Sequence, residues 1–131
     1  AGSILCDGRI LFPFVNPPGF DLAQFITTIK RLMKLNATAI YYAHFGVSHR
    51  VQPNLELALN KVLAWDDIVT RALSENNADS IAEKMANQCH KEIEAARNQK
   101  PVYEFIKSNI PACAAAYIKY YQDRELTAHR N

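Results

Sequence analysis

The chain has 131 residues, of which 49% are hydrophobic and 21% are charged, and this size and composition fit one globular domain. The formal net charge is only +2, and the basic residues form no dense stripe of the kind that binds nucleic acid. No apolar run is long enough to span a bilayer and no signal peptide is visible, so we expect a cytoplasmic protein that binds neither nucleic acid nor membrane.

The cysteines point to a reducing environment. Cys6, Cys89 and Cys113 are far apart in the sequence and odd in number. This pattern argues against a disulfide framework and against a Cys-x-x-Cys zinc site. We therefore expect free, buried thiols.

The first residues predict a β-hairpin. Two β-prone runs, residues 3–6 and 9–14, are separated by Asp7-Gly8, a strong signal for a tight hairpin turn. The apolar run starts directly after Ala1-Gly2-Ser3, without the polar leader usual before a first strand. We therefore expect that the chain was cut from a longer protein or carries an expression remnant.

A helix is predicted from Asp21 to about Asn36. Asp21 can cap it with Gln24 as the second member of a capping box, and Phe20 can act as a hydrophobic staple. Residues at helical spacing form one apolar face: Leu22, Phe25, Ile26, Ile29, Leu32 and Met33. A strand covered on both faces is predicted over residues 38–43, so that strand, helix and strand form a βαβ-like crossover.

The remainder of the sequence predicts four helical segments. The first begins near Pro53, and its apolar stripe passes through Trp65 or Asp66, of which Trp65 is expected to pack in the helical layer. Asp79 is expected to cap the second. Pro101 opens the third, and Pro111 is expected to break the chain and open the fourth. Residues 126–131 are expected to fray.

One of the four histidines stands out by its position. His44 follows the strand predicted at residues 38–43 and precedes Gly46, which permits a sharp turn. Ligands of α/β sheets gather at the carboxyl ends of strands, and a neutral imidazole is a good zinc ligand. The alternative is that His44 only forms hydrogen bonds within its own loop.

The order of these motifs resembles the C-terminal half of a metallo-β-lactamase superfamily protein. The resemblance rests on Phe12-Pro13, on residues 16–21 (Asn-Pro-Pro-Gly-Phe-Asp), on the amphipathic helix that follows, and on residues 42–46 (Tyr-Ala-His-Phe-Gly). It covers residues 1 to about 70 well and the remainder loosely.

The resemblance implies the fold class α/β, as the C-terminal half of an αββα sandwich with few strands, a crossover helix and a helical C-terminal appendix. Residues 1–75 would belong to the sandwich and residues 76–131 would be its helical extension. In this family two divalent metal ions are bound, usually zinc and sometimes iron or manganese. Most ligands come from a His-x-His-x-Asp-His motif, which this sequence lacks.

His44 corresponds to the last histidine ligand of the family. Asp7 is a candidate for the bridging carboxylate, but the Asp-Gly turn already explains it, and Ala1-Gly2 matches the end of the family's Gly-Asp-Ser-Ala-Gly loop. The bridging aspartate would then precede residue 1. Substrate contacts are expected from Asn16, Phe20, His49 and Arg50, which lie in loops before and after the helix.

The expected function follows from this resemblance. The parent would hydrolyse a small-molecule thioester, lactone, lactam or phosphodiester, whereas this chain alone would bind no metal and be inactive. An exposed strand edge and apolar helix faces would make the chain a homo-oligomer. The alternative is a helical interaction or dimerisation module formed by residues 53–125, in which His44 is incidental.

Overall fold

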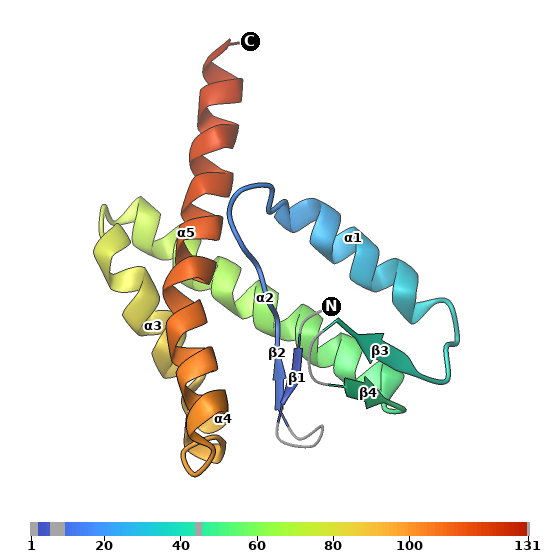
Figure 1. Cartoon of the computed structure of the whole chain (residues 1–131). Coiled ribbons are helices and arrows are strands. Elements are labelled where there is room, and N and C mark those ends of the chain that lie inside the picture. Colours follow the sequence, from blue (N-terminus) through green and yellow to red (C-terminus); the bar gives the residue numbers. More distant parts are fainter. Residues whose placement is uncertain (1–2, 6–9, 44–45, 131) are drawn as a thin grey trace.

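The computed structural model describes residues 3–5, 10–43 and 46–130. Within these ranges the chain is mostly helical and has two short antiparallel sheets, so it is a mixed α/β protein (Figure 1). The elements in chain order are β1 (Ser3–Leu5), β2 (Ile10–Phe12), α1 (Leu22–Met33), β3 (Ile40–Tyr42), β4 (Gly46–Ser48), α2 (Val51–Ser74), the 3-10 helix η1 (Ala78–Ser80), α3 (Ile81–Gln88), α4 (His90–Ala95) and α5 (Lys100–Arg130).

The first sheet confirms the predicted hairpin pairing. β1 and β2 are antiparallel, with Ile4 opposite Leu11, whereas the expected turn residues Asp7 and Gly8 lie outside the described residues. β2 is buried on both faces, because Ile10 and Phe12 belong to the larger core cluster and Leu11 to the smaller one. This arrangement follows from the alternation of side chains along a strand. β2 therefore lies between two parts of the core.

The start of α1 is as the sequence predicts. The carboxylate of Asp21 accepts a hydrogen bond of 2.9 Å from the backbone N–H of Gln24. The rings of Phe20 and Phe25 lie 6.3 Å apart, which is the contact of a hydrophobic staple across the cap. Asn36, just after the helix, has a φ of 49°, a conformation that asparagine tolerates better than most residues. Cap, staple and Asn36 together fix both ends of α1.

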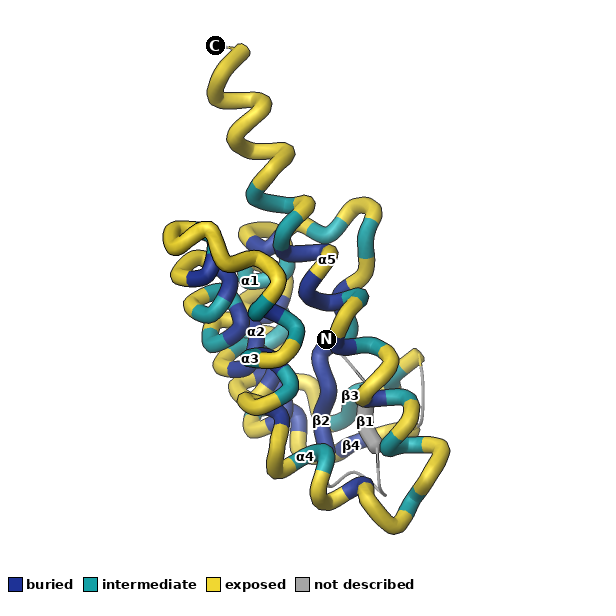
Figure 2. Tube along the Cα trace, turned by 90° about the vertical axis from the view of Figure 1, so that its left-hand side faces the viewer, coloured by how far each residue is buried: buried dark blue, intermediate teal, exposed yellow. Residues whose placement is uncertain are grey.

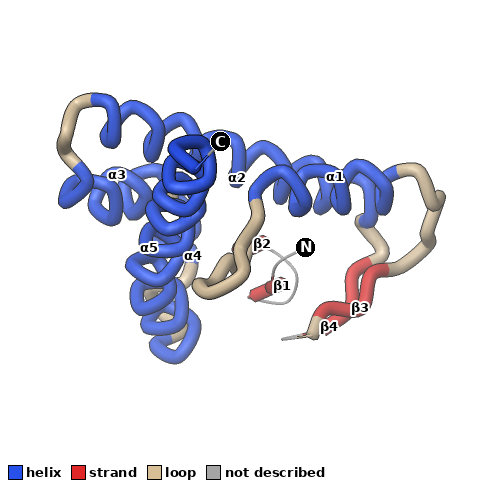
Figure 3. The backbone as a smooth tube through the Cα atoms, turned by 90° about the horizontal axis from the view of Figure 1, so that it is seen from above, coloured by secondary structure: helices blue, strands red, loops and turns tan. Residues whose placement is uncertain are grey.

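The expected βαβ-like crossover is wrong for the described residues. β3 pairs antiparallel with β4, its neighbour in sequence, and not with β1 or β2 (Figure 3). Nor is β3 covered on both faces, since the side chain of Tyr41 is 83% exposed. β3 has only three residues, and it pairs with β4 instead of joining the sheet formed by β1 and β2.

α2 lies at the centre of the molecule and contacts α1, α3, α5 and β2. Its buried stripe includes Trp65, which is fully buried, as the sequence predicts. The ring of Trp65 meets Phe12 of β2 at 5.5 Å and Tyr117 of α5 at 6.5 Å, both edge to face. The hydroxyl of Tyr117 donates a hydrogen bond of 2.7 Å to the carbonyl of Val62, one turn before Trp65. One aromatic cluster thus joins the first strands to the last helix.

The helices after α2 differ from expectation in their boundaries. Asp79 lies in η1 and does not cap α3, which Ser80 precedes instead. The single helical segment expected between Asp79 and Pro101 divides at Cys89 into α3 and α4. Cys89 and Cys113 are buried and free, as expected, whereas Cys6 lies outside the described residues.

α5 runs unbroken through Pro111, so the expected break at this proline is wrong. Proline removes one backbone N–H and crowds the carbonyl four residues earlier, here that of Lys107. Both Pro111 and Lys107 are exposed, so water can solvate that carbonyl. The last turns, expected to fray, are helical to Arg130 and project beyond the buried part of the molecule (Figure 2).

We predict that Pro111→Ala stabilises the protein by about 1–3 kcal/mol, because alanine restores the missing backbone hydrogen bond inside a continuous helix. Urea unfolding followed by far-ultraviolet circular dichroism measures this change. Ala112→Gly, one position along the same helix, is the matched control and is expected to destabilise the protein. A Pro111→Ala protein less stable than the parent would contradict a helix that continues through this position.

Candidate functional site

The candidate metal ligand follows β3 and precedes β4 in the sequence. His44 and Phe45 lie outside the described residues. Tyr42 and Gly46, on either side of this gap, are paired, and Ile40 is paired with Ser48 at the other end of the two strands. Two residues separate Ser48 from α2, so the junction of this small sheet with the first turn of α2 lies at the Ile40–Ser48 end.

A buried serine organises this junction. Ser48 is 9% exposed, and its hydroxyl oxygen accepts hydrogen bonds from the backbone N–H of Arg50 at 3.1 Å and from the side-chain amide of Asn54 at 2.9 Å. Asn54 lies in the first turn of α2 and is also buried. These two bonds fix the end of β4 against the start of α2. Neither residue stands out in the sequence, since serine and asparagine near a helix start usually act as ordinary caps.

Tyr42 places an unsatisfied hydroxyl beside this network. Its oxygen is buried and has no hydrogen-bond partner among the described residues. Burial raises the pKa of Tyr42, and the neighbouring Asn54 side chain partly offsets the increase. The hydroxyl is therefore a neutral, protonated group at ordinary pH. A buried polar group without a partner is uncommon and costs stability.

The two predicted substrate residues after β4 are exposed. Nδ1 of His49 lies 3.2 Å from the carbonyl oxygen of Thr38, which fits a ring that is protonated at Nδ1 and donates to this carbonyl. In that tautomer Nε2 carries the free lone pair, and this arrangement is the one in which histidines commonly bind metals. The backbone N–H of Arg50 donates a hydrogen bond to the hydroxyl of Ser48, and this bond fixes the backbone from which the Arg50 side chain extends.

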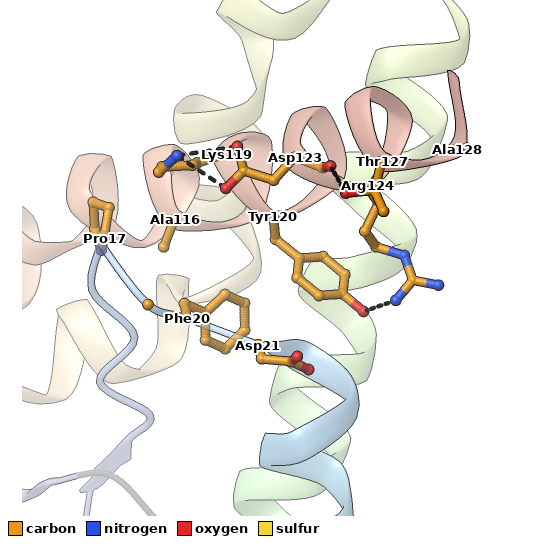
Figure 4. Close-up of a pocket in the computed structure, with 11 residues that line it drawn as sticks. Pro17, Phe20, Asp21, Ala116, Lys119, Tyr120, Asp123, Arg124, Thr127 and Ala128 are labelled. Carbon is orange, nitrogen blue, oxygen red and sulfur yellow. Dashed lines mark hydrogen bonds and ion pairs between the residues drawn. The ribbon is translucent and has the colours of Figure 1, made fainter. Parts of the chain in front are cut away.

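The other two predicted substrate residues lie elsewhere. Asn16 is exposed in the loop before α1, and Phe20 lines a groove between this loop and α5 (Figure 4). α1 has 12 residues and separates this loop from β3. At about 1.5 Å per residue the helix spans roughly 18 Å. The four predicted substrate residues therefore form two groups at opposite ends of α1, and not one site.

A second buried polar cluster went unpredicted. Lys61 of α2 is only 6% exposed and forms an ion pair with Glu92 of α4. Its Nζ also lies 3.9 Å from the sulfur of Cys89, and burial raises the pKa of this thiol, which Lys61 partly offsets. The indole N–H of Trp65 donates to the side-chain oxygen of Gln88 at 3.1 Å. The cluster ties α4 to α2.

A catalytic zinc site needs about three protein ligands. In the part of the chain that the structure describes, which excludes His44, no three His, Cys, Asp or Glu side chains form a group that could hold a metal ion.

No described helix combines the length and the apolar character needed to cross a bilayer. Comparison with known proteins found no family model, no curated protein and no solved structure that matches the chain.

Proposed function

We propose that this chain is part of a metal-dependent hydrolase of the metallo-β-lactamase superfamily, in which His44 is one of the metal ligands. The observation that carries the proposal is the order of elements around this histidine. A Pro-Pro-Gly-Phe-Asp segment leads into α1, which is capped by Asp21, and α1 leads through β3 to His44. The proposed parent fold is the αββα sandwich, to which this chain would supply the C-terminal half.

The chemistry proposed for the parent is hydrolysis assisted by two divalent metal ions, with zinc as the first candidate. Such ions activate water and polarise a carbonyl or phosphoryl oxygen. The chain itself would supply a neutral imidazole from His44. The exposed side chains of His49 and Arg50, next to β4, can meet an anionic substrate there. Thioesters, lactones, lactams and phosphodiesters are the candidate substrates, and without the other ligands the chain alone would be inactive.

The test is metal analysis of the complete gene product, isolated without chelators, with and without the substitution His44→Ala. We expect about two metal ions per chain in the parent and the loss of at least one in the variant, because a two-metal site needs every ligand. His129→Ala is the matched control, since His129 is exposed in the last turn of α5. Its metal content should equal that of the parent.

Hydrolysis of a panel of thioester, lactone, lactam and phosphodiester substrates should fall in parallel with the metal content. A metal-free gene product, or a His44→Ala protein with unchanged metal content and activity, would overturn the proposal. Circular dichroism of the variant would show whether any loss of metal reflects unfolding and not a missing ligand.

A second candidate function is self-association through the β3–β4 sheet. Tyr41 and Val47 are paired across the two strands, and their side chains are 83% and 46% exposed. An isolated two-stranded sheet is marginally stable in water and gains stability by packing against another element. A second copy of the chain that packed the same face of its own β3–β4 sheet here would cover the apolar pair in both copies.

We predict that the chain forms dimers and that Tyr41→Lys shifts it to the monomer, because a charge on this face opposes burial. Size-exclusion chromatography with light scattering at several protein concentrations measures this shift. Leu126→Lys is the matched control, because Leu126 is 60% exposed but lies on α5. A monomeric parent would contradict the sheet-mediated dimer. Dissociation by Leu126→Lys alone would place the contact between copies on α5 instead.

A further inference from the structure

A groove lies between the loop that precedes α1 and the second half of α5 (Figure 4). Its volume is about 630 Å³, which is within the range of small-molecule sites. Its lining comes from two segments far apart in sequence, which lie within residues 17–21 on one side and within residues 116–128 on the other.

Aromatic rings form one wall of this groove. The rings of Phe20 and Tyr120 lie 6.1 Å apart and tilted, so they present a broad apolar surface. Phe20 is held from behind by Tyr117 at 4.9 Å and by Phe25 of α1. Because Phe25 and Tyr117 fix the position of Phe20, the aromatic surface of the groove is already formed without a ligand. A flat apolar group would find a preformed surface here.

The groove is lined by two cationic and two acidic side chains, so its formal charge is zero. Lys119 and Asp123 pair with each other at 2.9 Å, and Asp21 is engaged in capping α1. Arg124 has no carboxylate within 4.0 Å among the described residues. Its side chain is oriented nonetheless, because Nη1 donates to the hydroxyl of Tyr120 at 2.9 Å and Cζ lies 5.3 Å from the centre of that ring.

We propose that this groove binds a small aromatic oxyanion, whose ring lies against Phe20 and Tyr120 and whose carboxylate or phosphate pairs with Arg124. A guanidinium has five N–H donors in a planar fork, and one of those of Arg124 is used by Tyr120. The others suit the bidentate geometry of a carboxylate or phosphate. The hydrogen bond to Tyr120 holds the fork in place, so less side-chain entropy is lost when the anion binds.

This groove is independent of the proposed metal site. It lies at the start of α1, whereas His44 follows β3 beyond the other end of that helix. The two proposals therefore fail separately: a chain without metal can still bind the anion, and a metal-loaded hydrolase can lack this second site.

The test is titration of the isotope-labelled chain with benzoate and with phenyl phosphate, followed by amide chemical shifts. We expect saturable changes confined to residues 17–25 and 116–128. Both probes carry the ring and the anion, and their relative affinity tells whether carboxylate or phosphate is preferred. Benzyl alcohol has the same ring without charge and should bind more weakly than both.

Arg124→Ala should weaken binding of the preferred probe by at least about tenfold, because it removes a charge-assisted hydrogen bond pair. Arg124→Lys keeps the charge but loses the planar fork, so we expect an intermediate affinity. The matched control is Arg71→Ala, since Arg71 is exposed on α2 and already pairs with Asp67 at 3.1 Å. Its affinity should equal that of the parent.

Three results would overturn the proposal. The first is the absence of saturable shifts with either anion, and the second is equal binding of benzyl alcohol. The third is unchanged affinity in Arg124→Ala. Because Arg124 is exposed, its variants should fold normally, and their unperturbed spectra in the absence of probe would verify this.

Discussion

The burial of Trp65 between β2 and α5 is the contact on which the remaining structure depends. Phe12 comes from the first strands and Tyr117 from the last helix, and both rings meet this one indole edge to face. The hydroxyl of Tyr117 also satisfies the backbone carbonyl of Val62 on the same helix. Residues separated by most of the chain are thereby held against α2. The loop before α1 has a fixed position because Phe20 packs on Tyr117.

α1 acts as a spacer on this framework. Phe20 and Asp21, directly before its first turn, line the groove beside α5, and its last turn leads to the β3–β4 sheet. A rigid helix of this length keeps the two regions apart. The anion-binding groove and the histidine after β3 are therefore two separate candidate sites, and each can be tested without reference to the other.

Local signals predicted local structure well. The cap at Asp21, the staple at Phe20 and the pairing of the first two strands all follow from interactions between residues close in sequence. The apolar stripe of α2 likewise identified Trp65 as a core residue. These features needed no knowledge of distant partners, and for that reason the sequence was sufficient.

Features that depend on distant partners or on solvent were not predictable in this way. Pro111 is tolerated inside α5 because it faces water, and the sequence alone does not say which side of the helix is exposed. Lys61 lies four residues before Trp65 on the same helical stripe, which was the signal for its burial, but its partner Glu92 is on another helix. Arg124 lines a groove only because the loop before α1 packs against α5, a contact between segments far apart in the sequence.

One core, centred on α2, unites the first strands with the last helix. Its most direct test is equilibrium unfolding in urea, followed both by the fluorescence of Trp65, the only tryptophan, and by far-ultraviolet circular dichroism. Coincident transitions with a single midpoint are the predicted result. Two separate transitions, with the helices of residues 76–131 unfolding independently of Trp65, would contradict a single core.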